Sequence, residues 1–301
     1  MAIKTVKFTL NGQTYILVYD AASQTYKATV TAPSVTSWNE NNDHKYHGTV
    51  VATDDAGNTA TATVADFPTL ALRVLEKVKP TIAVTYPTAS AFITSATPTF
   101  RWTVTDAGSG VDPDTISIKI DGNTAITSGI TKTPVTNGYE CSYTPTSALA
   151  EGAHTVYFNV SDNDGNAATQ VSTAFTIDTV PPTLNITSPA EGLITNKSAL
   201  VVSGTTNDAT SSPVTVKVTV NNGTAQNAEV SSDGSFSLNV TLTEGANVIK
   251  VVATDSAGKS TSIERNVTLD TGAPVITAIT LVPNPVDAGA TYIITVTVTD
   301  D

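Results

Sequence analysis

Two short signatures recur along this 301-residue chain, at intervals of roughly 100 residues. The first is a strand-like segment that runs into Asn-Gly or Asp-Gly, with its glycine at Gly12, Gly122 and Gly223. The second is a strand-like segment that runs into an Asp-rich turn, with its glycine at Gly57, Gly165 and Gly258. This period is too long for a solenoid unit and matches small domains in tandem. The repeat therefore predicts a series of similar modules.

The residue pattern predicts strands throughout these modules. With 40% hydrophobic and only 14% charged residues, the chain is too apolar for disorder. Its many Thr and Val residues fit a pleated sheet, and apolar residues alternate with polar ones at 99–104, 215–220 and 235–240. The alternation at 99–104 predicts that Trp102 points into a core. Residues 70–79 are predicted to form a closing strand. Short strands with many turns predict an all-β fold of antiparallel β-sandwiches.

Proline follows a strand-like segment at three places and marks short, stiff joints between modules. The joints predict two complete domains over residues 80–181 and 182–273. The first hairpin glycine, Gly12, comes too early for a full sandwich, so residues 1–79 are expected to lack their opening strands. Residues 274–301 read as the opening strands of an incomplete domain.

The joints at Asp178 and Asp270 share the sequence Asp-Thr-x-x-Pro, and turn segments lie at Ile186–Gly192, Thr243–Asn247 and Ala253–Gly258. These joints and turns resemble those of bacterial and phage immunoglobulin-like repeats. The resemblance is strongest over Pro182–Asp270, clear over Pro80–Asp178 and weaker before that. It implies tandem immunoglobulin-like antiparallel β-sandwiches, a fold that serves many roles.

The resemblance implies a structural or attachment role, without catalysis. A net charge of -12 argues against a nucleic-acid partner, and no apolar run reaches the roughly 20 residues of a membrane span. The start of the chain lacks a signal-peptide pattern, although the repeats look extracellular. We therefore expect a phage virion component of a tail, baseplate or capsid decoration, made in the host cytoplasm, that adheres weakly to host-surface glycans. A bacterial surface adhesin or surface-layer fragment, and an accessory module of a carbohydrate-active enzyme, remain open alternatives.

The uneven ends suggest how the chain could assemble. Residues 274–301 hold two opening strands, and residues 1–79 lack theirs. Strand donation from 274–301 to another copy of the chain or to another virion protein would complete a sandwich. The alternatives are that residues 1–79 form a smaller variant, and that the last strands dock elsewhere or continue in a longer protein.

Acidic loops are the candidates for a cation. Hard cations such as calcium prefer clustered carboxylates, and two loops supply them: Asp106, Asp112 and Asp114 in one, Asp162 and Asp164 in the other. Asp178 and Asp270 at the joints could share a further ion. The EF-hand spacing is missing, and turns in which Asp bonds its own backbone explain the same residues. Calcium is therefore a possibility, and no other cofactor is expected.

The aromatic, histidine and cysteine residues offer further candidates for a binding or reactive site. Trp38, His44, Tyr46 and His47 share one polar, aromatic loop that could bind a metal or stack on a sugar, or simply be solvated. Known catalytic motifs are missing, and His154 occupies the turn position that Asn247 fills in the next module. The single cysteine, Cys141, reads as a buried packing residue, since a reactive thiol would need a basic neighbour.

Overall fold

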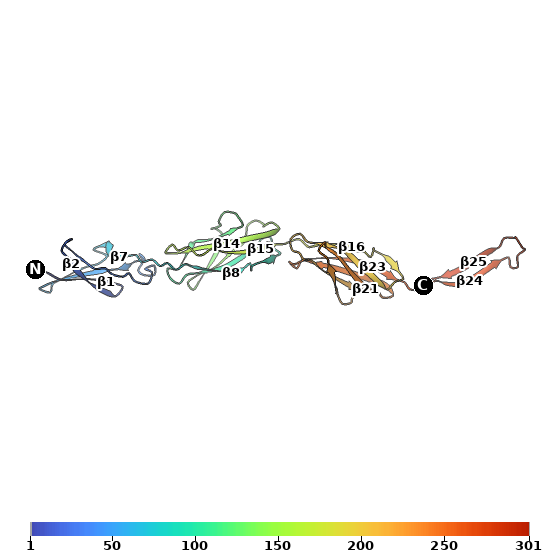
Figure 1. Cartoon of the computed structure of the whole chain (residues 1–301), viewed down its shortest axis with the longest axis horizontal. Helices are drawn as coiled ribbons and strands as arrows, with labels where there is room; N and C mark the ends of the chain where they lie inside the picture. The colour runs from blue at the N-terminus through green and yellow to red at the C-terminus, as the bar shows by residue number, and fades with distance from the viewer. Residues whose placement is uncertain (1, 301) are drawn as a thin grey trace. The chain divides into compact units, whose positions relative to one another are not determined.

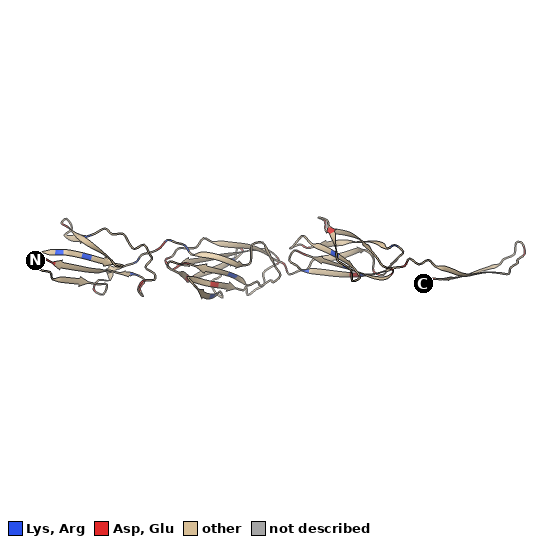
Figure 2. Cartoon of the chain, turned by 90° about the horizontal axis from the view of Figure 1, so that it is seen from below, with Lys and Arg blue, Asp and Glu red and all other residues tan. Residues whose placement is uncertain are grey.

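A computed structural model describes residues 2–300 of the chain (Figure 1). It divides into two compact units, Met1–Ala91 with Thr97–Phe175 and Phe92–Ala96 with Thr176–Asp301. Apart from one 3₁₀ turn, η1 (Pro68–Leu70), all regular structure of the described residues is β-strand, which confirms the all-β prediction. None of these residues belongs to a helix long and apolar enough for a membrane crossing. Figure 2 shows Lys and Arg spread singly along the strands.

The first unit begins with a five-stranded sheet, here called the N-terminal sheet. Its order is β3-β2-β1-β5-β6. The Asn-Gly pair after β1 turns the chain as predicted, because Asn11 and Gly12 both adopt positive φ angles of 45° and 73°. The strands are β1 (Ile3–Leu10), β2 (Gln13–Asp20), β3 (Thr25–Lys27), β5 (Thr49–Asp54) and β6 (Thr59–Ala62), with a separate pair of β4 (Tyr46–His47) and β7 (Ala71–Leu72).

The predicted closing strand over residues 70–79 is wrong for most of its length. Only Ala71–Leu72 form a strand, and the rest of the segment has no ladder partner. Ser37 holds its backbone at Val74 instead, because the N–H of Val74 donates to Oγ of Ser37 at 3.0 Å and the backbone O of Val74 accepts the N–H of Ser37 at 2.9 Å. A contact between residues so far apart leaves no trace in local alternation.

The rest of the first unit belongs to a β-sandwich, here called the first sandwich, whose strands β9 and β15 end in the second unit. Its two sheets have the orders β12-β13-β10-β8 and β11-β14-β15-β9, and Figure 1 shows β14 and β15 on the side opposite β8. Trp102 of β10 packs on Phe158 of β14 with ring centroids 5.1 Å apart, so the sheets meet face to face. The strands are β8 (Thr81–Tyr86), β9 (Ala91–Ile93), β10 (Phe100–Thr105), β11 (Val111–Ile120), β12 (Thr131–Val135), β13 (Gly138–Tyr143), β14 (Gly152–Asp162) and β15 (Val171–Ile177).

The second unit contains the second sandwich, which repeats this strand order. Its order is β16-β18-β21-β20-β19-β22-β23-β17, and β20 joins the two layers by pairing with both β19 and β21. Val202, Phe236 and Ile249 lie in one buried cluster from both layers. The strands are β16 (Thr183–Ser188), β17 (Leu193–Thr195), β18 (Ala199–Asn207), β19 (Thr215–Val220), β20 (Gln226–Val230), β21 (Ser235–Thr241), β22 (Gly245–Thr254) and β23 (Ser260–Leu269).

The strands of the two sandwiches correspond one to one. The first opening strand lies in one sheet, β8 beside β10 and β16 beside β18. The short strand that follows crosses to the other sheet, β9 beside β15 and β17 beside β23. This shared topology confirms tandem immunoglobulin-like sandwiches. Any residue of one sandwich can therefore be compared with its equivalent in the other.

The second unit ends in a hairpin of β24 (Val275–Val282) and β25 (Ile293–Thr299). Every residue of both strands is exposed, including Ile276, Ile279 and Ile293 at 60%, 61% and 68%. A two-stranded hairpin with apolar residues on both faces is marginal in water.

Candidate metal centres in two acidic clusters

An acidic cluster in the second unit brings together three carboxylates from three separate segments. Asp178 follows β15, Asp208 follows β18 and Asp255 follows β22. One carboxylate oxygen from each lies within 4.8 Å of those of the other two. All three residues are buried, with exposures of 0%, 8% and 6%. We call these residues the Asp178 cluster.

Hydrogen bonds fix the position of each carboxylate in the Asp178 cluster. Oδ1 of Asp255 accepts the N–H of Lys259 at 2.8 Å and so closes the Asp-x-x-Gly turn. Oδ1 of Asp208 accepts the N–H of Ser211 at 2.7 Å. The hydroxyl of Ser211 donates to Oδ2 of Asp178. The backbone of the two loops and the hydroxyl of Ser211 therefore hold the carboxylates in place.

Among the described residues, no ion pair balances the charge of the Asp178 cluster. No Lys, Arg or His of residues 2–300 forms an ion pair with these carboxylates. Oδ2 of Asp255 is buried and accepts no hydrogen bond from any described residue. Two carboxylates at such separations repel by roughly 3–4 kcal/mol at an effective dielectric constant of about 20. A cation placed among the three carboxylates would offset this repulsion.

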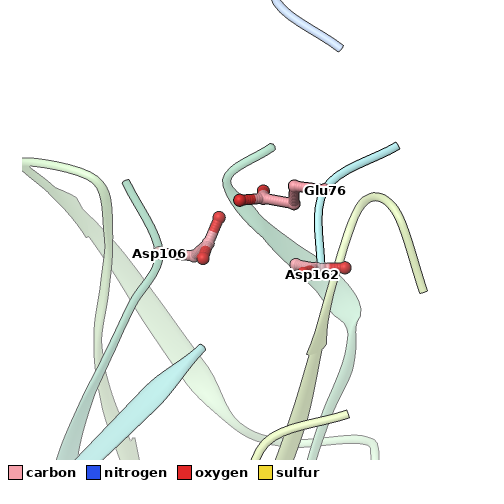
Figure 3. Close-up of side chains that lie close together, drawn as sticks. All are labelled: Glu76, Asp106 and Asp162. Atoms are coloured by element: carbon pink, nitrogen blue, oxygen red, sulfur yellow. The ribbon is translucent and has the colours of Figure 1, made fainter. Parts of the chain in front are cut away.

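A second cluster of the same kind lies in the first unit. Glu76 precedes β8, Asp106 follows β10 and Asp162 ends β14, and Figure 3 shows their carboxyl groups coming from three separate segments. One oxygen from each lies within 4.8 Å of the others. Asp106 and Asp162 are 5% and 2% exposed, and Glu76 is half-buried. We call these residues the Glu76 cluster.

Burial and neighbouring charges shift the pKa of Asp106 in the Glu76 cluster. Burial raises the pKa of Asp106, the charges of Glu76 and Asp162 add to that rise, and the N–H of Gly110, which donates to its Oδ2 at 2.7 Å, opposes it. The N–H of Ser109 donates to Oε1 of Glu76, while Oγ of Ser109 is buried and has no hydrogen-bond partner among the described residues. One polar atom beside this cluster is thus also unpaired.

The two clusters occupy equivalent places in the two sandwiches. One acidic residue lies five positions before the strand that opens the sandwich, β8 or β16. The second directly follows β10 or β18, and starts the same Asp-Ala-x-Ser sequence. The third opens the Asp-x-x-Gly turn after the long strand β14 or β22. The equivalent pairs are Glu76 and Asp178, Asp106 and Asp208, and Asp162 and Asp255.

The sequence prediction found part of these clusters. Asp106 and Asp162 belong to the Glu76 cluster. Asp112 and Asp114 lie in β11 outside it, and the N–H of Asp114 donates to Oδ1 of Asp112 at 3.0 Å. Asp164 is buried against Arg73, with Nη2 of Arg73 at 2.5 Å from its Oδ1. Asp112, Asp114 and Asp164 thus lie outside the three-carboxylate groups.

Of the two joint residues predicted as possible ion ligands, Asp178 and Asp270, only one lies in an acidic cluster. Asp178 belongs to a cluster, with Asp208 and Asp255 as its neighbours, whereas Asp270 belongs to neither cluster and its Oδ1 accepts the N–H of Gly272 at 3.0 Å. Glu76 and Asp208 were missed altogether. A signal exists for each: Glu76, Asp178 and Asp270 each lie five residues before a strand begins, and Asp208 starts the same Asp-Ala-x-Ser sequence as Asp106.

The side chains of the aromatic loop at residues 38–47 contact other groups of the protein. The ring of His44 stacks on that of Trp38 with centroids 3.9 Å apart, and Arg73 lies 4.9 Å from the Trp38 ring. Tyr46 is only 4% exposed, and its hydroxyl donates to the backbone O of Val35. Nε2 of His47 lies 3.0 Å from a carboxylate oxygen of Asp43. These groups already contact protein partners, and their role in metal or sugar binding stays a prediction.

Cys141 is buried in β13, as predicted, at 4% exposure. Burial raises the pKa of its thiol to about 11. The structure does supply a basic neighbour, because Lys132 pairs with Cys141 across β12 and β13, but its charge lowers the pKa only in part. The geometry is that of a packing residue.

His154 makes the structural contacts that its equivalent Asn247 makes in the second sandwich. Nε2 of His154 lies 2.9 Å from the backbone O of Ala150, four residues earlier. Nδ2 of Asn247 likewise donates to the backbone O of Thr243 at 2.7 Å. Nδ1 of His154 also lies 2.8 Å from Oδ2 of Asp121. Both side chains therefore fasten a turn.

The stability contributed by His154 should depend on pH. Burial opposes the charged ring, but the carbonyl of Ala150 and the carboxylate of Asp121 outweigh it and raise the pKa above its ordinary 6.5. The contribution is therefore full below pH 6.5 and is lost as the pH rises through the folded-state pKa. Urea unfolding between about pH 5 and pH 9 should show this fall. His154→Asn, which installs the residue of the second sandwich, should remove it, and an unchanged slope in that variant would contradict the assignment.

Two family models match the two sandwiches. Residues 86–179 match the bacterial Ig-like domain, and residues 182–271 match domain B of glucodextranase. The repeated topology and the match to the bacterial Ig-like domain indicate the same fold. The chain is therefore built of tandem immunoglobulin-like β-sandwiches.

Individual relatives cover different parts of the chain. Bacillopeptidase F of Bacillus subtilis strain 168 is 32% identical over 131 residues, which make up 44% of this chain and 9% of that protein. The matched region thus spans about a tenth of that relative's length. The fibronectin(III)-like modules of Clostridium thermocellum CbhA are 16% identical, with 63% of this chain and 94% of that chain covered and a TM-score of 0.38. A tetra-tandem repeat from the extending region of a large adhesion protein is 20% identical, with 98% and 79% covered and a TM-score of 0.35.

Proposed function

We propose that this chain is a non-enzymatic structural and attachment segment, in which repeated sandwiches act as spacers and contact surfaces within a larger assembly. The observation that carries the proposal is the one-to-one correspondence of the strands in the two sandwiches, each with its own two layers. A fold repeated along a chain multiplies length and surface, whereas a catalytic site needs to be built only once. The match to the bacterial Ig-like domain supports this reading.

A second candidate is an accessory module of a large bacterial enzyme. The match of residues 182–271 to domain B of glucodextranase favours it. The similarity to a small part of Bacillopeptidase F favours it as well, because that protein is far longer than the matched region. In this setting the chain would position or anchor a catalytic domain that lies outside it. The virion and cell-surface settings rest on the sequence argument alone.

The exposed β24–β25 hairpin supports a proposal about assembly. Its apolar residues face solvent on both sides, and strands of this kind are stabilised when they complete a sheet. A second copy of the chain could receive them. Removing residues 274–301 should then lower the assembly state in sizing experiments, and an unchanged assembly state would contradict strand donation.

The setting can be tested by locating the chain. Mass spectrometry of purified particles, of the cell-surface fraction and of the secreted fraction should detect its peptides in one of the three. Peptides in particles would support a virion protein, and peptides in the surface or secreted fractions would support the adhesin or the accessory module. Peptides confined to the cytosol, or turnover that depends on residues of this chain, would contradict the proposal.

A further inference from the structure

We propose that each acidic cluster binds one calcium ion, so that the chain carries two built cation sites. The Asp178 cluster carries the argument. Its three carboxylates are buried within 4.8 Å of one another, and Oδ2 of Asp255 is a buried oxygen that accepts no hydrogen bond from the described residues. This oxygen is an observation separate from the acidity of the cluster, since the turn that contains Asp255 is closed by its other oxygen, Oδ1.

The turn alone does not account for these residues. Asp54 in the N-terminal sheet opens the same Asp-x-x-Gly turn, and its Oδ1 accepts the N–H of Asn58 at 2.9 Å. Asp54 belongs to neither cluster and is not buried. The equivalent turns at Asp162 and Asp255 each add two carboxylates from distant segments. The extra acidic groups therefore serve something other than the turn.

The chemistry of the donors selects the ion. All six side chains in the two clusters offer carboxylate oxygens, and neither cluster includes a His or Cys. Oxygen-only sites suit hard cations, whereas zinc prefers nitrogen and sulfur. Calcium binds oxygens at about 2.3–2.6 Å, so ligands on opposite sides of one ion lie up to roughly 5 Å apart. Oxygens within 4.8 Å of one another fit around such an ion, and calcium tolerates the irregular geometry of three loops better than magnesium does.

An ion at these places would tie the segment that enters each sandwich to two of its loops. Asp178 lies in the entering segment, and Asp208 and Asp255 lie in loops of the second sandwich. Glu76 occupies the same position ahead of the first sandwich. The chain also repeats two of the three positions around its last hairpin, with Asp270 five residues before β24 and Asp300 directly after β25.

Calcium titration of the whole 301-residue chain tests the stoichiometry. Isothermal calorimetry with CaCl₂ after removal of metals by EGTA should detect two bound ions. Asp255→Asn and Asp162→Asn should each weaken one site by roughly tenfold or more, because ligand charge sets calcium affinity. Asp54→Asn is the matched control, since it changes the same kind of turn outside the clusters, and it should leave both sites intact. No binding, or an equal loss in the Asp54 variant, would overturn the proposal.

Thermal unfolding separates a cation site from a purely structural turn. At a calcium concentration a hundredfold above its Kd, the unfolding midpoint of the second unit should rise by about 10 °C relative to EGTA. Asp255→Asn should lose this rise and should be at least as stable as the wild type in EGTA, because it removes one of three repelling charges. A variant that is less stable in EGTA, or a wild-type midpoint that calcium does not move, would overturn the proposal. Magnesium at the same concentration should give a smaller rise.

Discussion

Trp102→Ala is expected to lower the free energy of unfolding of the first sandwich by about 3–5 kcal/mol. Trp102 is 1% exposed and packs across the two sheets on Phe158, which is fully buried. Truncation would open a cavity between two layers whose backbones are fixed by hydrogen-bonded ladders on both sides. Because such layers cannot collapse freely, most of the lost packing would remain unrecovered.

Trp102→Phe is the matched control for this prediction. Nε1 of Trp102 is buried and has no hydrogen-bond partner among the described residues, so part of the packing energy of the indole is offset by an unpaired donor. Phenylalanine removes that donor and leaves a smaller cavity, and it should therefore cost clearly less than alanine. Urea unfolding followed by circular dichroism, together with scanning calorimetry, measures both variants. A loss below about 1 kcal/mol for Trp102→Ala would contradict the packing described here.

The core could be predicted because its signal is local. Alternation at 99–104 places Phe100, Trp102 and Val104 on one face, and all three are buried. The repeat was equally informative for His154, whose equivalence to Asn247 in sequence is matched by equivalent hydrogen bonds in the structure. Both inferences compare residues within one strand or between copies of one module. They need no knowledge of how distant segments meet.

The clusters could be predicted only in part because they are assembled from distant segments. Asp106 and Asp162 stand out within acidic loops, but Glu76 is a single acidic residue in an ordinary stretch. Its proximity to Asp106 depends on the path of residues 73–79, and the prediction of a strand there was wrong. Asp255 was not among the predicted ligands, because its own turn holds no second carboxylate and its neighbours Asp178 and Asp208 come from elsewhere in the chain. An acidic loop in the sequence indicates single candidate ligands. A site built by several segments depends on how the fold brings those segments together.

Asp164→Ala is expected to destabilise the first unit by about 3–5 kcal/mol, because it breaks a buried ion pair from one side. The side chain of Asp164 is fully buried and Arg73 is 30% exposed. Oδ2 of Asp164 also accepts the hydroxyl of Thr36 at 2.5 Å and the N–H of Glu76 at 3.0 Å. Alanine would leave all three donors without this acceptor. The cost therefore includes more than the loss of one ion pair.

The location of Asp164 determines how the loss should appear. It lies in the turn between β14 and β15 of the first sandwich, whereas Thr36 and Arg73 belong to the segments around the N-terminal sheet. We expect the N-terminal sheet of Asp164→Ala to unfold in a separate, earlier calorimetric transition, and residues 73–79 to become sensitive to protease. Glu264→Ala is the matched control, since it breaks the Lys250–Glu264 pair, in which both side chains are about half exposed, and such pairs contribute little. If the two variants behave alike, Asp164 does not join the N-terminal sheet to the sandwich. If only Asp164→Ala shifts the first transition, the turn after β14 has two roles. Asp162 belongs to the Glu76 cluster, and Asp164, two residues later, attaches the N-terminal sheet to the first sandwich.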